Sequence, residues 1–253
     1  MKFLFLDELK YNQSKSKVYG LTAILIDAQN YLSFKELFET SLKNLGWNKK
    51  HELKGRSMFS ISGDKSISVE KRVGFMSEIV GISKSKTGKT AKISVYVVLN
   101  NFSKKYSEYN CYKTNLGKII KKLSKPSLKK KSLIGVFYDE NNCIKVQDFN
   151  QFLNRNLLER KLNLFESSFP IKSSLENPGI MFADYVCYFI QTFFQLSVFR
   201  KNIMGELIQL LEKDKNKTIN EEEKKKLSIH IISYKKEKKT KELIMALKKI
   251  IFV

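Results

Sequence analysis

The sequence predicts an α/β fold with a mixed sheet and helices on both of its faces. Short apolar runs alternate with segments of helical periodicity, which is the pattern of such a fold. Two of the runs, residues 1–8 (MKFLFLDE) and 133–140 (LIGVFYDE), are both apolar and both stop at Asp-Glu. A run that is apolar throughout is typical of a strand buried on both faces. We therefore expect these two runs to be buried strands of one sheet.

The remaining elements follow from periodicity and from stop signals. Further apolar or alternating runs predict strands at residues 18–26, 91–99 and 227–234, with a short extended segment at 163–169. Apolar residues at helical spacing predict helices at residues 33–45, 69–80, 146–162 and 178–199, a lysine-rich helix inside 101–131 that ends before Pro126, and a closing helix near 250. In the first helix, Ser33 and Glu36 form a capping box and Gly46 is a stop signal. The strand at 18–26 is expected to pair with the first strand as a hairpin.

The length of 253 residues suits one large domain or two small ones. We expect a main domain over residues 1–200 and a basic, mainly helical extension over residues 201–253 that packs on it. No long flexible linker separates the two parts. The strand expected at residues 227–234 is a candidate edge strand for a homodimer or for a protein partner.

The charge balance favours a polyanionic partner. The chain has 47 Lys and Arg against 25 Asp and Glu, which gives a net charge of +22 and a pI near 9.7. Nucleic acid is the first candidate and an anionic membrane surface the second. The composition resembles coding from an AT-rich genome, which explains many lysines. That bias would raise the number of glutamates as well, so it does not explain the imbalance.

The cysteines and histidines exclude a disulfide framework and a Cys/His zinc site. Cys111, Cys143 and Cys187 are few and scattered, and only two histidines are present. Acidic residues at positions 7 and 8 interrupt any signal-peptide pattern. These features lead us to expect a cytoplasmic protein.

The two Asp-Glu endings predict a pair of carboxylates. If the two strands are parallel neighbours, Asp7 and Asp139 leave adjacent strand ends about 5 Å apart. Carboxylates at that separation repel unless one is protonated or a cation lies between them. Oxygen ligands of this kind suit Mg²⁺ or Mn²⁺, and two such ions can activate a water and stabilise the leaving oxygen of a phosphodiester. The simpler interpretation is that Asp and Glu end strands as turn residues.

A third aspartate lies in the apolar segment at residues 178–199. Asp184, Tyr188, Gln191 and Gln195 share one face of the expected helix. The segment is apolar over about one membrane thickness, but these polar residues are costly in hydrocarbon. We therefore favour a buried helix whose polar stripe faces a site. Asp184 can also be read as a charge favoured at a helix N-terminus.

The loop His51-Glu52-Leu53-Lys54-Gly55 lies between two expected helices. Glu52 could supply a further carboxylate, His51 a proton shuttle and Lys54 a phosphate contact. The alternative is an ordinary solvated loop.

Residues 101–131 carry ten lysines against one acid, Glu108, with tyrosines interleaved at roughly helical spacing. Lysines neutralise phosphates and tyrosines can stack on bases. The alternative is an exposed lysine face with Tyr106, Tyr109 and Tyr112 on the core side. The candidate phosphate contacts are Lys104, Lys105, Lys113, Lys118, Lys121 and Lys122.

With FLFLDE, HELKG, GVFYDE and PGIMFADYV in this order, residues 1–199 resemble the family called domain of unknown function (DUF) 3800. That family is widespread in bacteria and phages and has a ribonuclease-H-like fold, with metal-dependent nuclease activity as the usual inference. The resemblance implies a two-metal centre. Its four carboxylates would be Asp7, Glu52, Asp139 and Asp184, with Glu8, His51, Lys54 and Glu140 beside them.

The chain departs from the family pattern at two points. Leu9-Lys10 replaces Ser-Gly after the first Asp-Glu, and Met181-Phe182 replaces Gln-Leu before Asp184. Neither change removes a carboxylate. The sequence thus predicts a nuclease, with an inactive nucleic-acid- or protein-binding module as the alternative. A third interpretation is a membrane-surface protein that uses its basic C-terminal helix.

Overall fold

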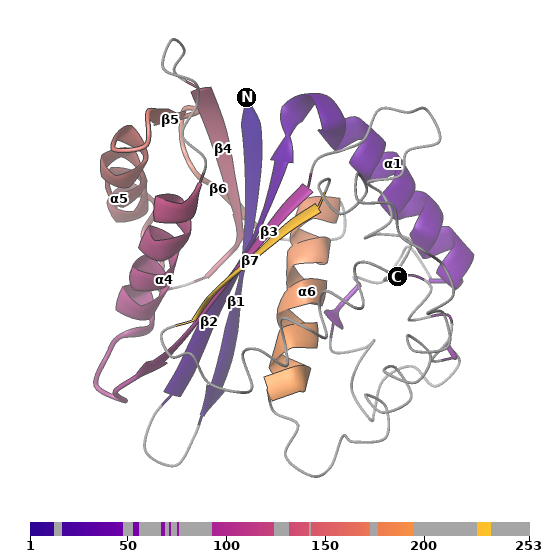
Figure 1. Ribbon diagram of the computed structural model, residues 1–253, viewed down its shortest axis with the longest axis horizontal. Helices are drawn as coiled ribbons and strands as arrows, with labels where there is room; N and C mark the ends of the chain where they lie inside the picture. The colour runs from indigo at the N-terminus through magenta and orange to yellow at the C-terminus, as the bar shows by residue number, and fades with distance from the viewer. Residues whose placement is uncertain are drawn as a thin grey trace.

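A seven-stranded mixed sheet forms the centre of the molecule in a computed structural model (Figure 1). The structure describes residues 1–12, 17–47, 53–55, 67–68, 71, 75, 93–123, 132–141, 143–172, 177–194 and 227–233. The strands are β1 (Lys2–Asn12), β2 (Lys17–Asp27), β3 (Ile93–Phe102), β4 (Ser132–Asp139), β5 (Leu162–Leu164), β6 (Phe169–Ile171) and β7 (Leu227–Ser233). The helices among these residues are α1 (Ala28–Leu45), α4 (Glu108–Lys122), α5 (Val146–Leu158) and α6 (Pro178–Phe194).

The strand order is β5-β4-β1-β2-β3-β7, and β6 pairs with β4. β1 and β2 form the antiparallel hairpin that was expected, with Asp7 opposite Thr22. β1 and β4 are parallel neighbours, with Leu6 in register with Tyr138. The two strands therefore lie side by side, and β4 ends at Asp139 as expected. The predicted end of the first strand is wrong: β1 continues beyond Asp7 and Glu8 to Asn12, because these residues still pair with β2 in the hairpin.

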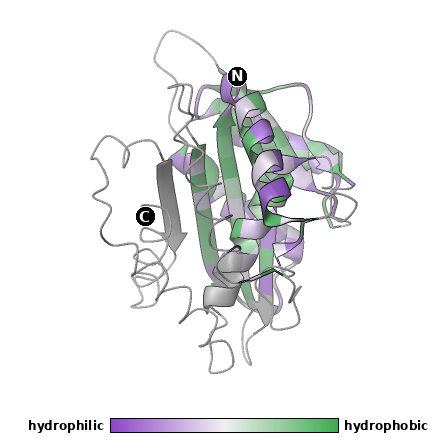
Figure 2. Ribbon diagram, turned by 90° about the vertical axis from the view of Figure 1, so that its right-hand side faces the viewer, coloured by the Kyte–Doolittle hydropathy of each residue, from purple (hydrophilic) through white to green (hydrophobic). Residues whose placement is uncertain are grey.

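Helices cover both faces of the sheet, as the sequence predicts. Side chains alternate along a strand, so every second residue of β1 points to the same face. Phe5 packs with α1 and α6 in one core, whereas Leu4 and Leu6 pack with α4 and α5 in a second core on the opposite face. Figure 1 shows the two helix pairs on either side of the sheet, and Figure 2 shows the hydrophobic strands behind α1.

The predicted start of the first helix is wrong. α1 begins at Ala28, directly after β2, because Asp27 ends the strand in an extended conformation and the chain enters the helix without a side-chain cap. Ser33 is therefore an exposed residue inside the helix and forms no capping box. The predicted stop is confirmed. Gly46 has a φ of 78°, and its N–H donates to the carbonyls of Leu42 and Lys43.

Other boundaries differ by a few residues. α5 ends at Leu158 instead of 162 because Lys161, with a φ of 58°, leads the chain into β5. In the lysine-rich segment, α4 begins at Glu108, and the side chain of Ser107 caps it by accepting a hydrogen bond from the N–H of Asn110. Apart from single positions, the helix expected at 69–80 lies outside the described residues. None of the helices in the described part of the chain is long and apolar enough to cross a membrane.

Beyond residue 200, the structure describes β7 alone. This strand pairs in parallel with β3 and belongs to the main sheet, and it confirms the strand expected near residues 227–234. The helices expected in the extension lie outside the described residues. The domain boundary at 200 stays a prediction.

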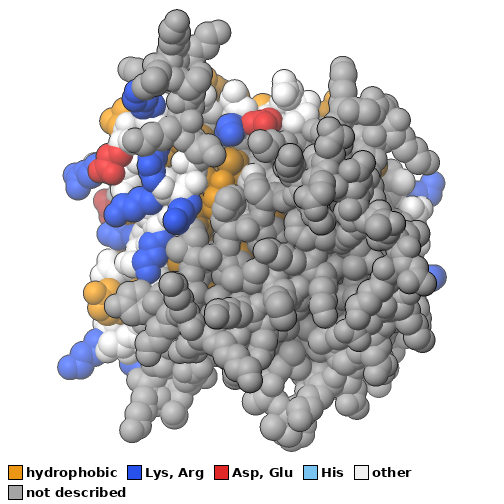
Figure 3. Space-filling model, viewed as in Figure 1, with side chains coloured by type: hydrophobic (Ala, Val, Ile, Leu, Met, Phe, Trp, Pro, Cys, Tyr) orange, Lys and Arg blue, Asp and Glu red, His pale blue; other side chains and the backbone are white. Residues whose placement is uncertain are grey.

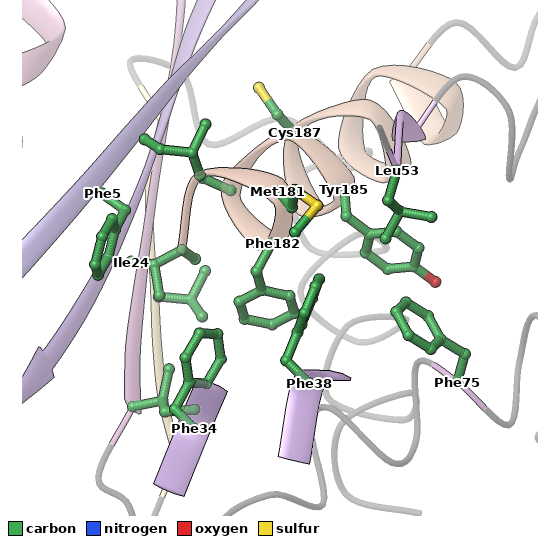
Figure 4. Packing of buried hydrophobic residues seen from close by; sticks show 14 of the residues in the cluster. Phe5, Ile24, Phe34, Phe38, Leu53, Phe75, Met181, Phe182, Tyr185 and Cys187 are labelled. Carbon is green, nitrogen blue, oxygen red and sulfur yellow. The ribbon is translucent and has the colours of Figure 1, made fainter. Parts of the chain in front are cut away.

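Phe38 is expected to be a major source of stability in the core between α1, α6 and the sheet. Its side chain is fully buried, and its ring lies 5.9 Å from the rings of Phe34 and Phe75 (Figure 4). Replacing Phe38 with alanine should lower the free energy of unfolding by about 3–5 kcal/mol, as measured by urea denaturation. Leu32→Ala is the control in the same helix, because Leu32 is 65% exposed and its loss should change stability by less than about 0.5 kcal/mol.

Candidate carboxylate site

Three aspartates meet on the face of the sheet covered by α1 and α6. Asp7 follows Phe5 on β1, and Asp139 follows Phe137 on β4, so both point to the face that holds these two rings. Asp184 comes from α6, which packs on the same face. All three side chains are half-buried. The structure therefore brings together three of the four carboxylates that the sequence singles out.

The electrostatics of Asp7 reflect this convergence. Burial raises the pKa of Asp7 well above its ordinary value, and the negative charges of Asp184, Glu8 and Asp139 raise it further, in that order. The backbone N–H of Glu8 donates to Asp7 and opposes part of the shift. A group of carboxylates that disfavours its own ionisation binds a proton or a cation in compensation. The local charge is thus suited to a positively charged ligand.

The loop that contains HELKG is attached to α6 at the third aspartate. The N–H of Gly55 donates to Oδ2 of Asp184 at 2.8 Å. Leu53 is fully buried in the core (Figure 4), while Lys54 between them is exposed. The predicted site residues Glu52 and His51 lie outside the described residues. They directly precede this anchored segment in the chain.

Gly55 permits this attachment because it lacks a side chain. A Cβ at this position would lie 2.5 Å from Cβ of Tyr188, 3.0 Å from the carbonyl oxygen of Asp184 and 3.2 Å from Cα of Tyr185. These atoms belong to α6, so they cannot move independently. The glycine allows the loop backbone to reach the helix and to donate its hydrogen bond.

Two further residues at the site were missed by sequence reasoning. Sγ of Cys187 lies 3.7 Å from the carbonyl oxygen of Asp7. Burial raises the pKa of the Cys187 thiol, and the charge of Asp7 raises it further, while a hydrogen bond with Thr22 opposes the shift. Thr22 is buried opposite Asp7 in the hairpin. The helical spacing of Cys187 from Asp184 and the hairpin register of Thr22 were the available signals.

The second acid of each Asp-Glu ending lies on the other face, contrary to the expectation that both acids belong to the site. Glu8 accepts hydrogen bonds from Nζ of Lys10 at 2.7 Å and Nδ2 of Asn141 at 2.5 Å, and Lys10 also bridges to Glu108 at 2.8 Å. Burial raises the pKa of Glu8, and the bond from Lys10 lowers it in part. Glu140 is exposed. The two-residue period of a strand separates neighbouring acids in this way.

Six lysines of the 101–131 segment are among the described residues, and they lie in α4 or just before it, on the side of the molecule where Figure 3 shows many Lys and Arg side chains. They lie on the opposite face of the sheet from α6 and Asp184. Lys118 donates to Oδ1 of Asn100 at 2.8 Å, and Nζ of Lys113 lies 4.3 Å from the ring centroid of Tyr109. The exposed lysines are Lys104, Lys105, Lys121 and Lys122.

The tyrosines interleaved with these lysines have different surroundings. Tyr112 is 1% exposed and packs against Phe149 in the core, so the interpretation of this ring as a base-stacking residue is wrong. Tyr109 is half-buried. Tyr106 is 50% exposed. The three tyrosines therefore pass from the surface at Tyr106, just before α4, to the core at Tyr112 within α4. The alternative interpretation expects this core position for Tyr112.

The donor set fits a hard divalent cation in chemistry. Carboxylate oxygens are the ligands that Mg²⁺ and Mn²⁺ prefer. Burial is the main cause of the raised pKa of Asp7, and the negative charges of Asp184, Glu8 and Asp139 add to it. Within the described ranges, no three Asp, Glu, His or Cys side chains form a group able to hold a metal ion. A complete ligand set therefore requires Glu52 or a change in the side-chain positions of the three aspartates.

Neither the protein-family models nor the curated proteins that were searched match this chain.

Proposed function

We propose that this protein is a divalent-metal-dependent nuclease that hydrolyses phosphodiester bonds of RNA or DNA, on the ribonuclease-H-like fold of the DUF 3800 family. The observation that carries the proposal is the convergence of Asp7, Asp139 and Asp184 from β1, β4 and α6 on one face of the sheet. Structural roles alone do not require two aspartates to gather where their charges raise the pKa of a third, Asp7.

The architecture supports the same proposal. The resemblance implies an N-terminal hairpin joined to parallel strands, with helices on both faces. The antiparallel β1–β2 pair, the parallel β1–β4 pair and the two helix layers agree with it. The attachment of Gly55 to Asp184 is a further point of agreement, because it links two of the four resembling motifs directly.

Asp7, Asp139 and Asp184, completed by Glu52, would hold Mg²⁺ or Mn²⁺, with a two-ion site as the expected form. When bound, such ions activate a water and stabilise the leaving oxygen of a phosphodiester. The chain's own contribution is to fix the carboxylates. The N–H of Gly55 orients Asp184, and the close packing of Cys187 orients the backbone at Asp7. Lys54 and the lysines of α4 would contact phosphates of a long substrate.

The test uses the full chain with labelled single-stranded and double-stranded RNA and DNA. We expect cleavage with Mg²⁺ or Mn²⁺, none in excess chelator, and loss of cleavage in Asp139→Asn. Glu8→Gln is the matched control, because Glu8 lies on the opposite face and is paired with Lys10. Equal cleavage with and without chelator would exclude the proposal.

An inactive binding module is the second candidate, and the separation of charge favours it. The lysine surface on α4 lies across the sheet from the carboxylates, so it can bind a polyanion without presenting it to them. This function predicts binding that weakens steeply with salt, no turnover with any divalent ion, and unchanged affinity in Asp7→Asn.

A further inference from the structure

Four aromatic rings form a continuous row across the sheet on the carboxylate face. The ring centroids are separated by 5.4 Å between Tyr31 and Phe5, by 5.1 Å between Phe5 and Phe137, and by 5.0 Å between Phe137 and Phe169. Each pair is stacked with an interplanar angle of 20°. The geometry is that of offset stacking, repeated from α1 through β1 and β4 to β6.

The row passes from the core toward the surface. Phe5 is 1% exposed, and the close approach of Gly179 to its ring closes it beneath α6. Phe137 and Phe169 are only partly buried. In the described part of the sheet, β6 pairs with β4 alone. Among the described rings, Phe169 is therefore the outer end of the stack.

This outer end lies beside the carboxylates. Phe137 precedes Asp139 by two residues on the same face of β4, which corresponds to about 7 Å along the strand. In the neighbouring strand, Phe169 is in register with Phe137, and Ile171 is in register with Asp139. A planar group stacked on Phe169 would thus have its substituents within reach of Asp139.

The charges around the site favour a ligand contact that does not depend on charge. Asp7, Asp139 and Asp184 repel a phosphate, and the exposed lysines of α4 lie on the other face of the sheet. Lys54 is exposed beside Gly55 and would contact a phosphate, and an interaction that does not depend on charge would add to the affinity close to the carboxylates. Stacking of a base on an aromatic ring is such an interaction and requires a base that is not paired inside a duplex.

We propose that Phe169, stacked on Phe137 behind it, forms a stacking platform for an unpaired nucleobase beside the carboxylate site, so that the substrate class is single-stranded nucleic acid. This inference rests on the proposed nuclease function. The platform binds the base through its π-face and leaves the adjoining phosphate next to Asp139. Because every base has a π-face, the platform selects for single strands and not for sequence.

The test measures binding in chelator, where cleavage cannot contribute. Short single strands of RNA and of DNA carry 2-aminopurine, whose fluorescence falls when it stacks. Phe169→Leu should weaken binding roughly 5- to 150-fold and abolish the quenching, which is the loss expected for one base–aromatic stack. Phe169→Trp should retain both. Phe152→Leu, a partly buried ring packed on the opposite face, is the matched control and should bind as the unsubstituted protein does.

The platform is overturned if Phe169→Leu, shown by circular dichroism to be folded, binds single strands as tightly as the unsubstituted protein. It is also overturned if the unsubstituted protein shows no quenching or prefers a duplex of the same sequence. Failure of the nuclease proposal gives a different result. In that case quenching by Phe169 persists in chelator, but no cleavage appears when Mg²⁺ or Mn²⁺ is added.

Discussion

Replacing Asp7 with asparagine is expected to abolish metal-dependent cleavage and, at the same time, to stabilise the metal-free protein at neutral pH. In the proposed function this carboxylate holds the metal, so we expect activity to fall by at least about 100-fold. The same carboxylate lies with Asp184 and Asp139 on one face of the sheet, and burial followed by the charges of Asp184, Glu8 and Asp139 raises its pKa. Removing its charge should raise the free energy of unfolding by about 0.5–2 kcal/mol, as measured by urea denaturation.

The gain in stability should depend on pH in a defined direction. Below the unfolded pKa of 3.8, Asp7 is neutral in both states, so the substitution has little effect. As the pH rises from 3.8 to the raised native pKa, the unfolded state ionises more readily than the folded state, and the unsubstituted protein loses stability. The advantage of Asp7→Asn therefore grows across that window and is constant above it. Added Mg²⁺ should stabilise the unsubstituted protein more than the variant.

Glu8→Gln is the control for this experiment. It changes the next acid on the same strand, but that side chain points to the opposite face and pairs with Lys10, so cleavage should be retained. The interpretation of Asp7 would be contradicted if Asp7→Asn kept metal-dependent cleavage. It would also be contradicted if the variant were less stable than the unsubstituted protein at neutral pH without metal.

Gly55→Ala is expected to damage both the fold and the site. The new Cβ would lie 2.5 Å from Cβ of Tyr188 and 3.0 Å from the carbonyl oxygen of Asp184, so the loop must move away from α6. We expect a loss of about 1–3 kcal/mol in the free energy of unfolding. Because the N–H that orients Asp184 moves as well, cleavage should fall about 10- to 100-fold. Urea denaturation and a cleavage assay on the same preparation measure the two effects.

Gly117→Ala is the matched control for this substitution. A Cβ at Gly117, in α4, would meet its nearest neighbour, a ring atom of Phe152, at 3.8 Å, which is an ordinary contact. Alanine favours a helix over glycine by up to about 1 kcal/mol, so the control should be slightly stabilised and fully active. A Gly55→Ala protein with normal stability and activity would show that the contact with α6 is not needed.

The sequence was sufficient for the parts of the fold that depend on local pattern. The two apolar runs correctly predicted two strands of one sheet, although β1 continues past Asp7 and Glu8 to Asn12. Gly46 correctly predicted the end of α1. The period of two also separates Glu8 from Asp7. Glu8, predicted beside the four carboxylates, raises the pKa of Asp7 through its charge, while its side chain pairs with Lys10 on the other face. The start of α1 could not be predicted, because β2 passes into the helix without a capping residue.

Contacts between distant segments were beyond sequence reasoning. The bond from Gly55 to Asp184 and the contact of Cys187 with Asp7 depend on how α6 packs against the sheet. The row of rings that ends at Phe169 depends on the register between β4 and β6. No local pattern encodes either arrangement. Sequence order suggested which motifs belong together, but not which atoms meet.

The bond between Gly55 and Asp184 spans 129 residues of chain, which has a consequence during protein synthesis. Closing so long a loop is entropically costly and must await the later segment. A ribosome-bound chain that carries β1, the loop and β4 still lacks the helix that delivers the third carboxylate. The proposed activity would therefore stay silent on the nascent polypeptide until α6 has left the ribosome, so nearby messenger RNA would not be exposed to it earlier.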